Sequence, residues 1–133
     1  MVTRGERNNN PGNIDKGQGF KGEVEGDDER FATFSTPVMG IRAIAALLLI
    51  YYNKHGLNTV AGLINRWAPP VENQTSAYVT DVANRVGVLP GDAIEVDDPD
   101  TLEKLVTGII WHENGECIYK QQQIEDGVDA ALA

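Results

Sequence analysis

Apolar residues recur at helical spacing through most of the chain after residue 36. The longest apolar run lies within residues 36–53, with Thr36 as a candidate N-cap, Pro37 in the first helical turn and Gly56 after the apolar stripe. Because no other segment is as apolar, this pattern predicts a buried central helix that begins at residue 36 and ends at residue 53 or 54.

Four other segments show the same periodicity. They predict helices over residues 59–67, 75–86 and 99–112 and a short one over 124–131. Pro69 and Pro70 separate the first two segments, and Asn114 and Gly115 follow the third. The second half of the chain is therefore expected to be almost entirely helical.

The first 36 residues have a different pattern, rich in Gly, Asn and charged side chains. Only residues 31–34 alternate as a strand does, so this third is predicted to be loop and a small β-hairpin. A length of 133 residues suits one domain. The expected fold class is mostly α, an α+β helical bundle with a loop-rich N-terminal third, in a single domain over residues 1–133.

Charge and cysteine content narrow the range of functions. The net charge of −9 argues against nucleic acid as a partner, since phosphates are bound through dense Lys and Arg patches. The single Cys117 cannot form an internal disulfide, which indicates folding in a reducing cytoplasm. No secretory signal and no apolar segment of about 18 to 20 residues is visible, so we expect a protein that is not embedded in a membrane.

Metal binding has little support in the sequence. His55 and His112 lie far apart, and neither an HExxH motif nor a cysteine pair occurs. No metal and no cofactor are therefore expected.

The segment RGERNNNPGNI, residues 4–14, is chemically unusual. It places one carboxylate, Glu6, between Arg4 and Arg7, and follows it with three Asn and a Pro-Gly turn. A segment that served only the core would not need this composition. The simplest structural interpretation is a solvated loop with surface ion pairs, because Asn and Gly favour turns.

Together with GIRA at residues 40–43, RWAPP at 66–70 and the ENQT segment at 72–75, this segment resembles a family of small phage and prophage proteins. These proteins are described as endolysin-like, virion-associated or structural, and they are similar to the lysozyme and lytic-transglycosylase superfamily. The resemblance covers nearly the whole chain. It implies a lysozyme-like fold and a glycosidase, a muramidase or lytic transglycosylase, that cuts the bond between N-acetylmuramic acid and N-acetylglucosamine in peptidoglycan.

By the same resemblance, Glu6 is the candidate catalytic acid. In lytic transglycosylases the catalytic glutamate precedes a polar stretch with Asn-Pro, although here the spacing is longer and Arg7 stands where Ser is usual. A buried Glu stays protonated and can protonate a leaving oxygen, provided that Arg4 and Arg7 point away from it. Asp15 is a candidate second carboxylate, but a mechanism that uses the substrate's N-acetyl group needs none. Glu113, at an expected helix end where a carboxylate is unfavourable, is a second candidate acid.

Other side chains are candidates for holding sugar or water. They are Asn8, Asn10, Thr33, Thr36, Glu72 and Tyr78. Each also has a purely structural interpretation: Thr36 as a helix cap, Tyr78 as a core aromatic, and the others as loop or strand surface.

The expected partner is the glycan of bacterial peptidoglycan, with other virion proteins as further candidates. The protein would be made in the host cytoplasm and act on the cell wall, either as a free endolysin or within the virion. Its acidity opposes attraction to an anionic wall. Two alternatives therefore stay open: a virion structural protein without activity, and a cell-wall-binding module.

Overall fold

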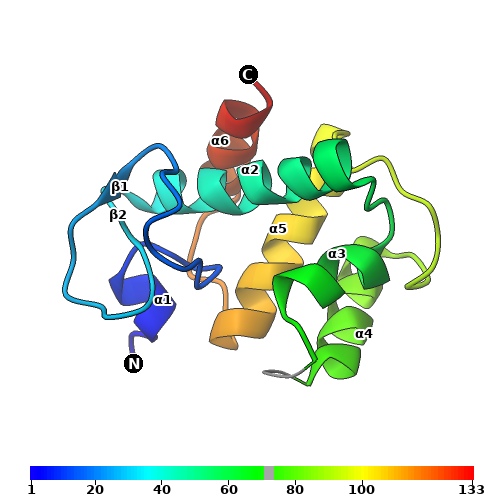
Figure 1. The fold of residues 1–133 in the computed structure, drawn as a ribbon, viewed down its shortest axis with the longest axis horizontal. Coiled ribbons are helices and arrows are strands. Elements are labelled where there is room, and N and C mark those ends of the chain that lie inside the picture. The colour runs from blue at the N-terminus through cyan, green and yellow to red at the C-terminus, as the bar shows by residue number, and fades with distance from the viewer. Residues whose placement is uncertain (71–73) are drawn as a thin grey trace.

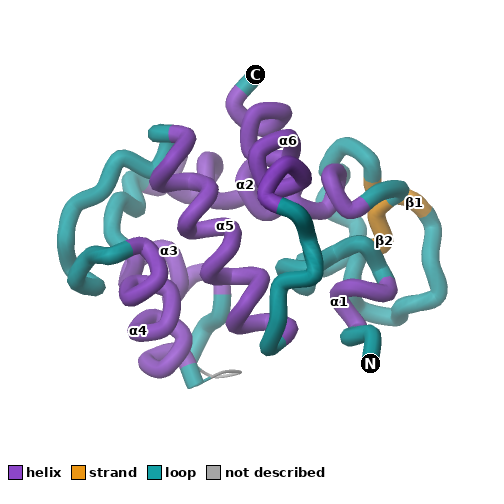
Figure 2. Tube along the Cα trace, turned by 180° about the vertical axis from the view of Figure 1, so that it is seen from behind, coloured by secondary structure: helices purple, strands orange, loops and turns teal. Residues whose placement is uncertain are grey.

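The computed structural model describes residues 1–70 and 74–133 and is mostly helical, with a loop-rich N-terminal third (Figures 1 and 2). Its elements in chain order are α1 (Arg4–Arg7), β1 (Glu23–Val24), β2 (Thr33–Phe34), α2 (Pro37–His55), α3 (Val60–Trp67), α4 (Thr75–Val86), α5 (Pro99–Asn114) and α6 (Gln121–Leu132). The predicted fold class, mostly helical with a small hairpin, is confirmed.

The long helix α2 crosses the molecule and connects its two sides (Figure 1). Thr36 caps its N-terminus by accepting a hydrogen bond from the backbone N–H of Met39, and Pro37 begins the helix, as predicted. Gly56 ends it in the left-handed conformation at φ +67°, where a residue without Cβ is favoured. None of the described helices is both long and apolar enough to cross a membrane.

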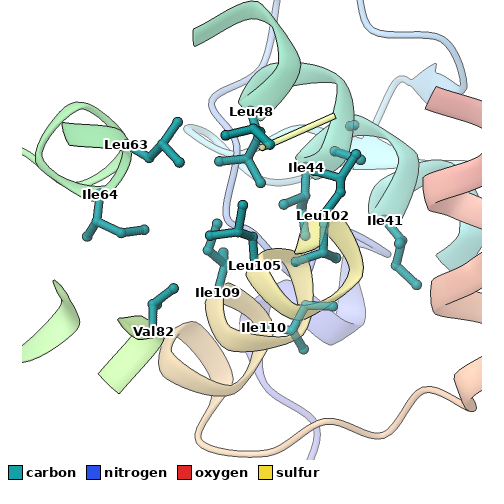
Figure 3. Packing of buried hydrophobic residues seen from close by; sticks show 14 of the residues in the cluster. Ile41, Ile44, Leu48, Leu63, Ile64, Val82, Leu102, Leu105, Ile109 and Ile110 are labelled. Carbon is teal, nitrogen blue, oxygen red and sulfur yellow. The ribbon is translucent and has the colours of Figure 1, made fainter. Parts of the chain in front are cut away.

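The core lies where α2, α3, α4 and α5 face one another (Figure 3). Its fully buried members include Ile44 and Leu48 of α2, Leu63 of α3, and Leu105 and Ile109 of α5. These side chains come from the apolar stripes of three predicted helices, so helical periodicity identified much of the core. Their burial removes apolar surface from water, which is the main favourable contribution to folding.

The helix boundaries differ from the predicted ones only at some ends. α5 continues two residues past the predicted end, and Gly115 follows it at φ +71°. α6 begins at Gln121, three residues earlier than predicted, because the Gln123 side chain accepts a hydrogen bond from the Lys120 backbone N–H. At α6 the backbone of Gly127 packs against Ile41 of α2, leaving no room for a Cβ.

The prediction that residues 1–36 contain only loop and hairpin is wrong at one place, since Arg4–Arg7 forms the short helix α1. A helix of four residues is too short to show hydrophobic periodicity. The signal was the capping box, Thr3 followed three residues later by Glu6. The hairpin itself is confirmed, with β1 and β2 antiparallel and Glu23 opposite Phe34.

Gly40, in the first turn of α2, lets the N-terminal loop lie directly against the helix. A Cβ at this position would come within 1.8 Å of the carbonyl oxygen of Asn9 and 3.2 Å of the Pro11 ring. The contact involves backbone, which cannot rotate away as a side chain end can. The GIRA motif therefore contains a glycine because two backbone segments meet there.

We predict that Gly40→Ala lowers the free energy of unfolding by about 1–3 kcal/mol, the usual cost of overpacking a filled interior. Thermal unfolding followed by circular dichroism measures the change. Gly91→Ala is the matched control, because a Cβ there meets no atom within 4 Å. Equal melting temperatures for the two variants would show that the Asn9 contact is not a constraint.

Candidate functional site

The N-terminal loop, α2 and the end of α3 are joined by glycine contacts. Gly12 lies against Ile44 of α2 and Trp67 of α3, and a Cβ on it would be 2.7 Å and 3.0 Å from their side chains. Gly40 makes the equivalent contact with Asn9. Three of the four segments that carried the resemblance, residues 4–14, GIRA and RWAPP, therefore meet in space.

Glu6 is buried, with 8% of its surface exposed. One of its two carboxylate oxygens has a structural role. Its Oε1 accepts a hydrogen bond from the backbone N–H of Thr3 at 2.8 Å, while the Thr3 hydroxyl accepts one from the Glu6 N–H. Its Oε2 is buried and has no donor within residues 1–70 and 74–133. One oxygen thus caps α1, and the other is left for a different partner.

The carboxyl group of Glu116, which follows the end of α5, interacts with that of Glu6. The pKa of Glu116 is raised, first by a hydrogen bond with Glu6 and then by the negative charge of Glu6 and by burial. Two ionised carboxylates cannot hydrogen-bond, so a bond between these two groups exists when one of them holds a proton. We refer to Glu6 and Glu116 as the acid pair.

Tyr119 and Cys117 are partly buried, and the charge of Glu6 acts on both. Burial, followed by the charges of Glu6 and Cys117, raises the pKa of the Tyr119 phenol to about 12. The phenol oxygen is buried and has no partner in the described part of the chain. Burial also raises the pKa of the Cys117 thiol, which keeps it protonated and inert.

Arg4, one of the two arginines that flank Glu6, is bound to a different carboxylate. It makes two hydrogen bonds of 2.6 Å to Asp28, and Arg7 is exposed. The guanidinium of Arg4 is therefore held by Asp28.

Asp28 and Glu116 are residues that sequence analysis missed. Besides Arg4, the carboxylate of Asp28 accepts hydrogen bonds from the Asn8 side chain at 3.0 Å and from the backbone N–H groups of Arg30 and Phe31 at 2.9 and 2.8 Å. These donors, Arg4 first, hold the pKa of Asp28 well below its usual range. Nothing in the sequence separated Asp28 from the solvated acidic residues around it.

Glu113 and Tyr78 are brought together, but as a structural pair. The Tyr78 hydroxyl donates to Glu113 Oε2 at 2.8 Å, and Asn13 Nδ2 donates to Oε1 at 2.8 Å. The Tyr78 ring is 2% exposed and stacks on His112 with centroids 3.9 Å apart. Burial, then the charge of Glu113, raises the pKa of Tyr78 well above its usual value. In this structure the ring is covered, so a contact between Tyr78 and a sugar stays a prediction.

Asn10 and Asn8 also face the interior. Asn10 is fully buried, and its side chain donates to the carbonyls of Ile14 and Ala32 and accepts from the Ile14 N–H. Asn8 is 7% exposed and donates to Asp28. Both were predicted to position sugar or water. In this structure the polar side-chain atoms of Asn10 and the Asn8 amide nitrogen form hydrogen bonds inside the protein, so their contacts with sugar or water stay predictions.

The remaining candidate residues lie in different parts of the structure. Thr36 is the cap of α2, which is its structural interpretation. Thr33 is half-buried with an unpartnered hydroxyl and lines the largest hollow, about 840 Å³, which lies within residues 16–33 and does not include Glu6. Glu72 lies outside the described residues. Asp15 is exposed and forms an ion pair with Arg30 at 3.1 Å.

Asp15 stands at the edge of a smaller groove of about 240 Å³ between the N-terminal loop and helices α2 and α3. Its lining includes Arg30, Arg66, Trp67 and Tyr51. Within residues 1–70 and 74–133, no three His, Cys, Asp or Glu side chains are grouped as metal ligands.

The comparisons with known proteins give one relationship. No family model matches the chain. The chain is similar to "Protein P5" of Pseudoalteromonas phage PM2, with 40% identity over 133 residues that cover 96% of this chain and 81% of the phage protein.

We predict that Asp28→Asn destabilises the protein at neutral pH but has less effect in acid. The lowered pKa of Asp28 means that its ionised form is favoured in the folded state. This contribution is complete above the ordinary value of 3.8 and is lost as the pH falls below it. Thermal unfolding across this range measures the effect. Asp27→Asn, an exposed neighbour, should leave the profile unchanged, and equal profiles for both variants would contradict the prediction.

A second prediction concerns the acid pair. Glu6→Gln should lower the pKa of Glu116 toward its ordinary value, because the negative charge beside it is removed. Carbon-13 NMR of the glutamate carboxyls follows this titration. The pKa of Glu103, raised by burial and by Glu125, is the internal control. An unchanged Glu116 titration would mean that the two carboxyls do not interact.

Proposed function

The chain belongs to the same phage protein family as protein P5 of Pseudoalteromonas phage PM2, and we propose that it cleaves the glycan strands of bacterial peptidoglycan. The bond cut is the one between N-acetylmuramic acid and N-acetylglucosamine. The acid pair supplies the proton, and the mostly helical fold with its N-terminal hairpin is compatible with a lysozyme-like scaffold.

The observation that carries this proposal is the interaction between the carboxyl groups of Glu6 and Glu116. Glu6 Oε2 is buried and has no donor among the described residues. A carboxyl group works as a general acid only if it keeps its proton near the working pH. A neighbouring carboxyl favours this, because the pair cannot easily ionise twice. Glu116 is the less buried member of the pair.

The geometry favours a mechanism with one acid over one with two separate carboxylates. Inverting and retaining enzymes hold their carboxylates about 5 to 9.5 Å apart, further than a hydrogen-bonded pair allows. In the proposed reaction the pair gives its proton to the bridging oxygen as the bond from that oxygen to the sugar carbon breaks. The substrate's own N-acetyl oxygen bonds to that carbon, and the ionised pair then takes a proton from the water or hydroxyl that completes the reaction.

A second candidate function is a virion structural or cell-wall-binding protein without activity. The observation that favours it is the capping box, which gives Glu6 a role in folding and leaves only 8% of the residue exposed. Such a protein would bind or assemble with no change in the glycan.

We predict that the purified protein releases soluble muropeptides from isolated peptidoglycan and that Glu6→Gln reduces release by at least about 100-fold, as loss of a general acid does. Mass spectrometry of the products distinguishes anhydro ends from reducing ends. Gln is the informative replacement, because its side-chain oxygen can still accept the Thr3 N–H bond of the capping box.

Two controls make the result interpretable. Glu95→Gln changes an exposed carboxylate and should keep full activity, and unfolding curves should show Glu6→Gln folded. A folded wild-type protein that releases no fragments over a broad pH range and several wall types would establish the second candidate function in place of the first.

A further inference from the structure

The groove between the N-terminal loop and helices α2 and α3 is separate from the described environment of the acid pair. We call it the Arg66 groove; it is lined by the backbone of residues 12–14 and by Asp15, Arg30, Tyr51, Arg66 and Trp67. Its volume of about 240 Å³ is smaller than the roughly 300–1,000 Å³ of sites for drug-sized ligands. The groove therefore has room for about one sugar ring rather than an extended chain.

Arg66 is held in place by an aromatic ring. Its guanidinium carbon lies 5.2 Å from the centroid of the Tyr51 ring, and Tyr51 in turn meets Trp67 edge-on at 6.3 Å. Within residues 1–70 and 74–133, no carboxylate forms an ion pair with Arg66. A positioned guanidinium without an anionic partner can bind a carboxylate from a ligand.

Two arginines, Arg30 and Arg66, line the groove in a chain whose net charge is −9. Among the described lining residues the carboxylate is Asp15, which pairs with Arg30 and not with Arg66. The Arg66 guanidinium is therefore the group that an anionic ligand would meet. Trp67 and Tyr51 add apolar ring surface with polar edges, which suits the mixed surface of a sugar.

We propose that the Arg66 groove binds a sugar that carries a carboxylate, with Arg66 contacting the carboxylate and Trp67 lying beside the ring. Binding here needs no reaction at the acid pair.

Asp15 is expected to weaken the binding of an anion in the groove. Its carboxylate pairs with Arg30 at 3.1 Å, so it competes with an incoming carboxylate for the positive charge of the groove. Removing the charge of Asp15 should therefore strengthen binding. If Asp15 were instead a catalytic carboxylate or a hydrogen-bond acceptor for the sugar, removing its charge would not strengthen binding.

The experiment is a titration of Trp67 fluorescence with N-acetylmuramic acid and with N-acetylglucosamine, which lacks the carboxylate. The chain has two tryptophans, so a Trp111→Phe background leaves Trp67 as the reporter. We expect binding of the acid at least about tenfold tighter than binding of the neutral sugar, the range of one charge-assisted hydrogen bond. Arg66→Gln should remove this preference.

The matched control is Arg85→Gln, because Arg85 lies 4.8 Å from the ring of residue 111 and outside the groove. It should bind the acid as the background does, while Asp15→Asn should bind it more tightly. Equal responses to both sugars, no response to either, or an Arg66→Gln variant that keeps the preference would overturn the proposal. Glu6→Gln should bind normally, so loss of cleavage and loss of binding are separate results.

Discussion

The carboxamide of Asn10 is fully buried and makes three hydrogen bonds to backbone groups, two at Ile14 and one at Ala32. The N-terminal third has little regular secondary structure, so the polar backbone groups that it buries need side chains as partners. Asn10 supplies them and fixes the Pro-Gly turn against the strand that leads into α2. The position of Gly12 beside Trp67, and with it one wall of the Arg66 groove, depends on this arrangement.

Aromatic rings position the arginines of this acidic protein. Arg4 and Arg30 lie over Phe31, Arg66 over Tyr51 and Arg85 over Trp111. A guanidinium on a ring loses little hydration and keeps its donors at the edge, where carboxylates can reach them. At Arg4 the acceptor is internal, Asp28, and the result is an anchored α1. At Arg66 the described structure provides no such acceptor, which is why the two sites have different roles.

The helices and most of the core were predictable because their signals are local. The apolar stripe of α2, its cap at Thr36 and its stop at Gly56 all lie within one segment, and the structure has them as predicted. The site was less predictable. Glu6 and Glu116 are 110 positions apart, and Asp28 becomes special only when Arg4 folds onto it. Asn10 and Tyr78 were assigned to sugar because sequence shows residue type and not what covers a side chain.

Residues near the N-terminus are hydrogen-bonded to the C-terminal end of α5. Thr3 donates to the Asn114 side chain at 2.6 Å, and Asn114 donates to the Pro11 carbonyl at 2.8 Å. During synthesis residues 3–11 therefore cannot make these contacts until α5 has emerged. A segment that is translated before α5 thus completes its structure only after it.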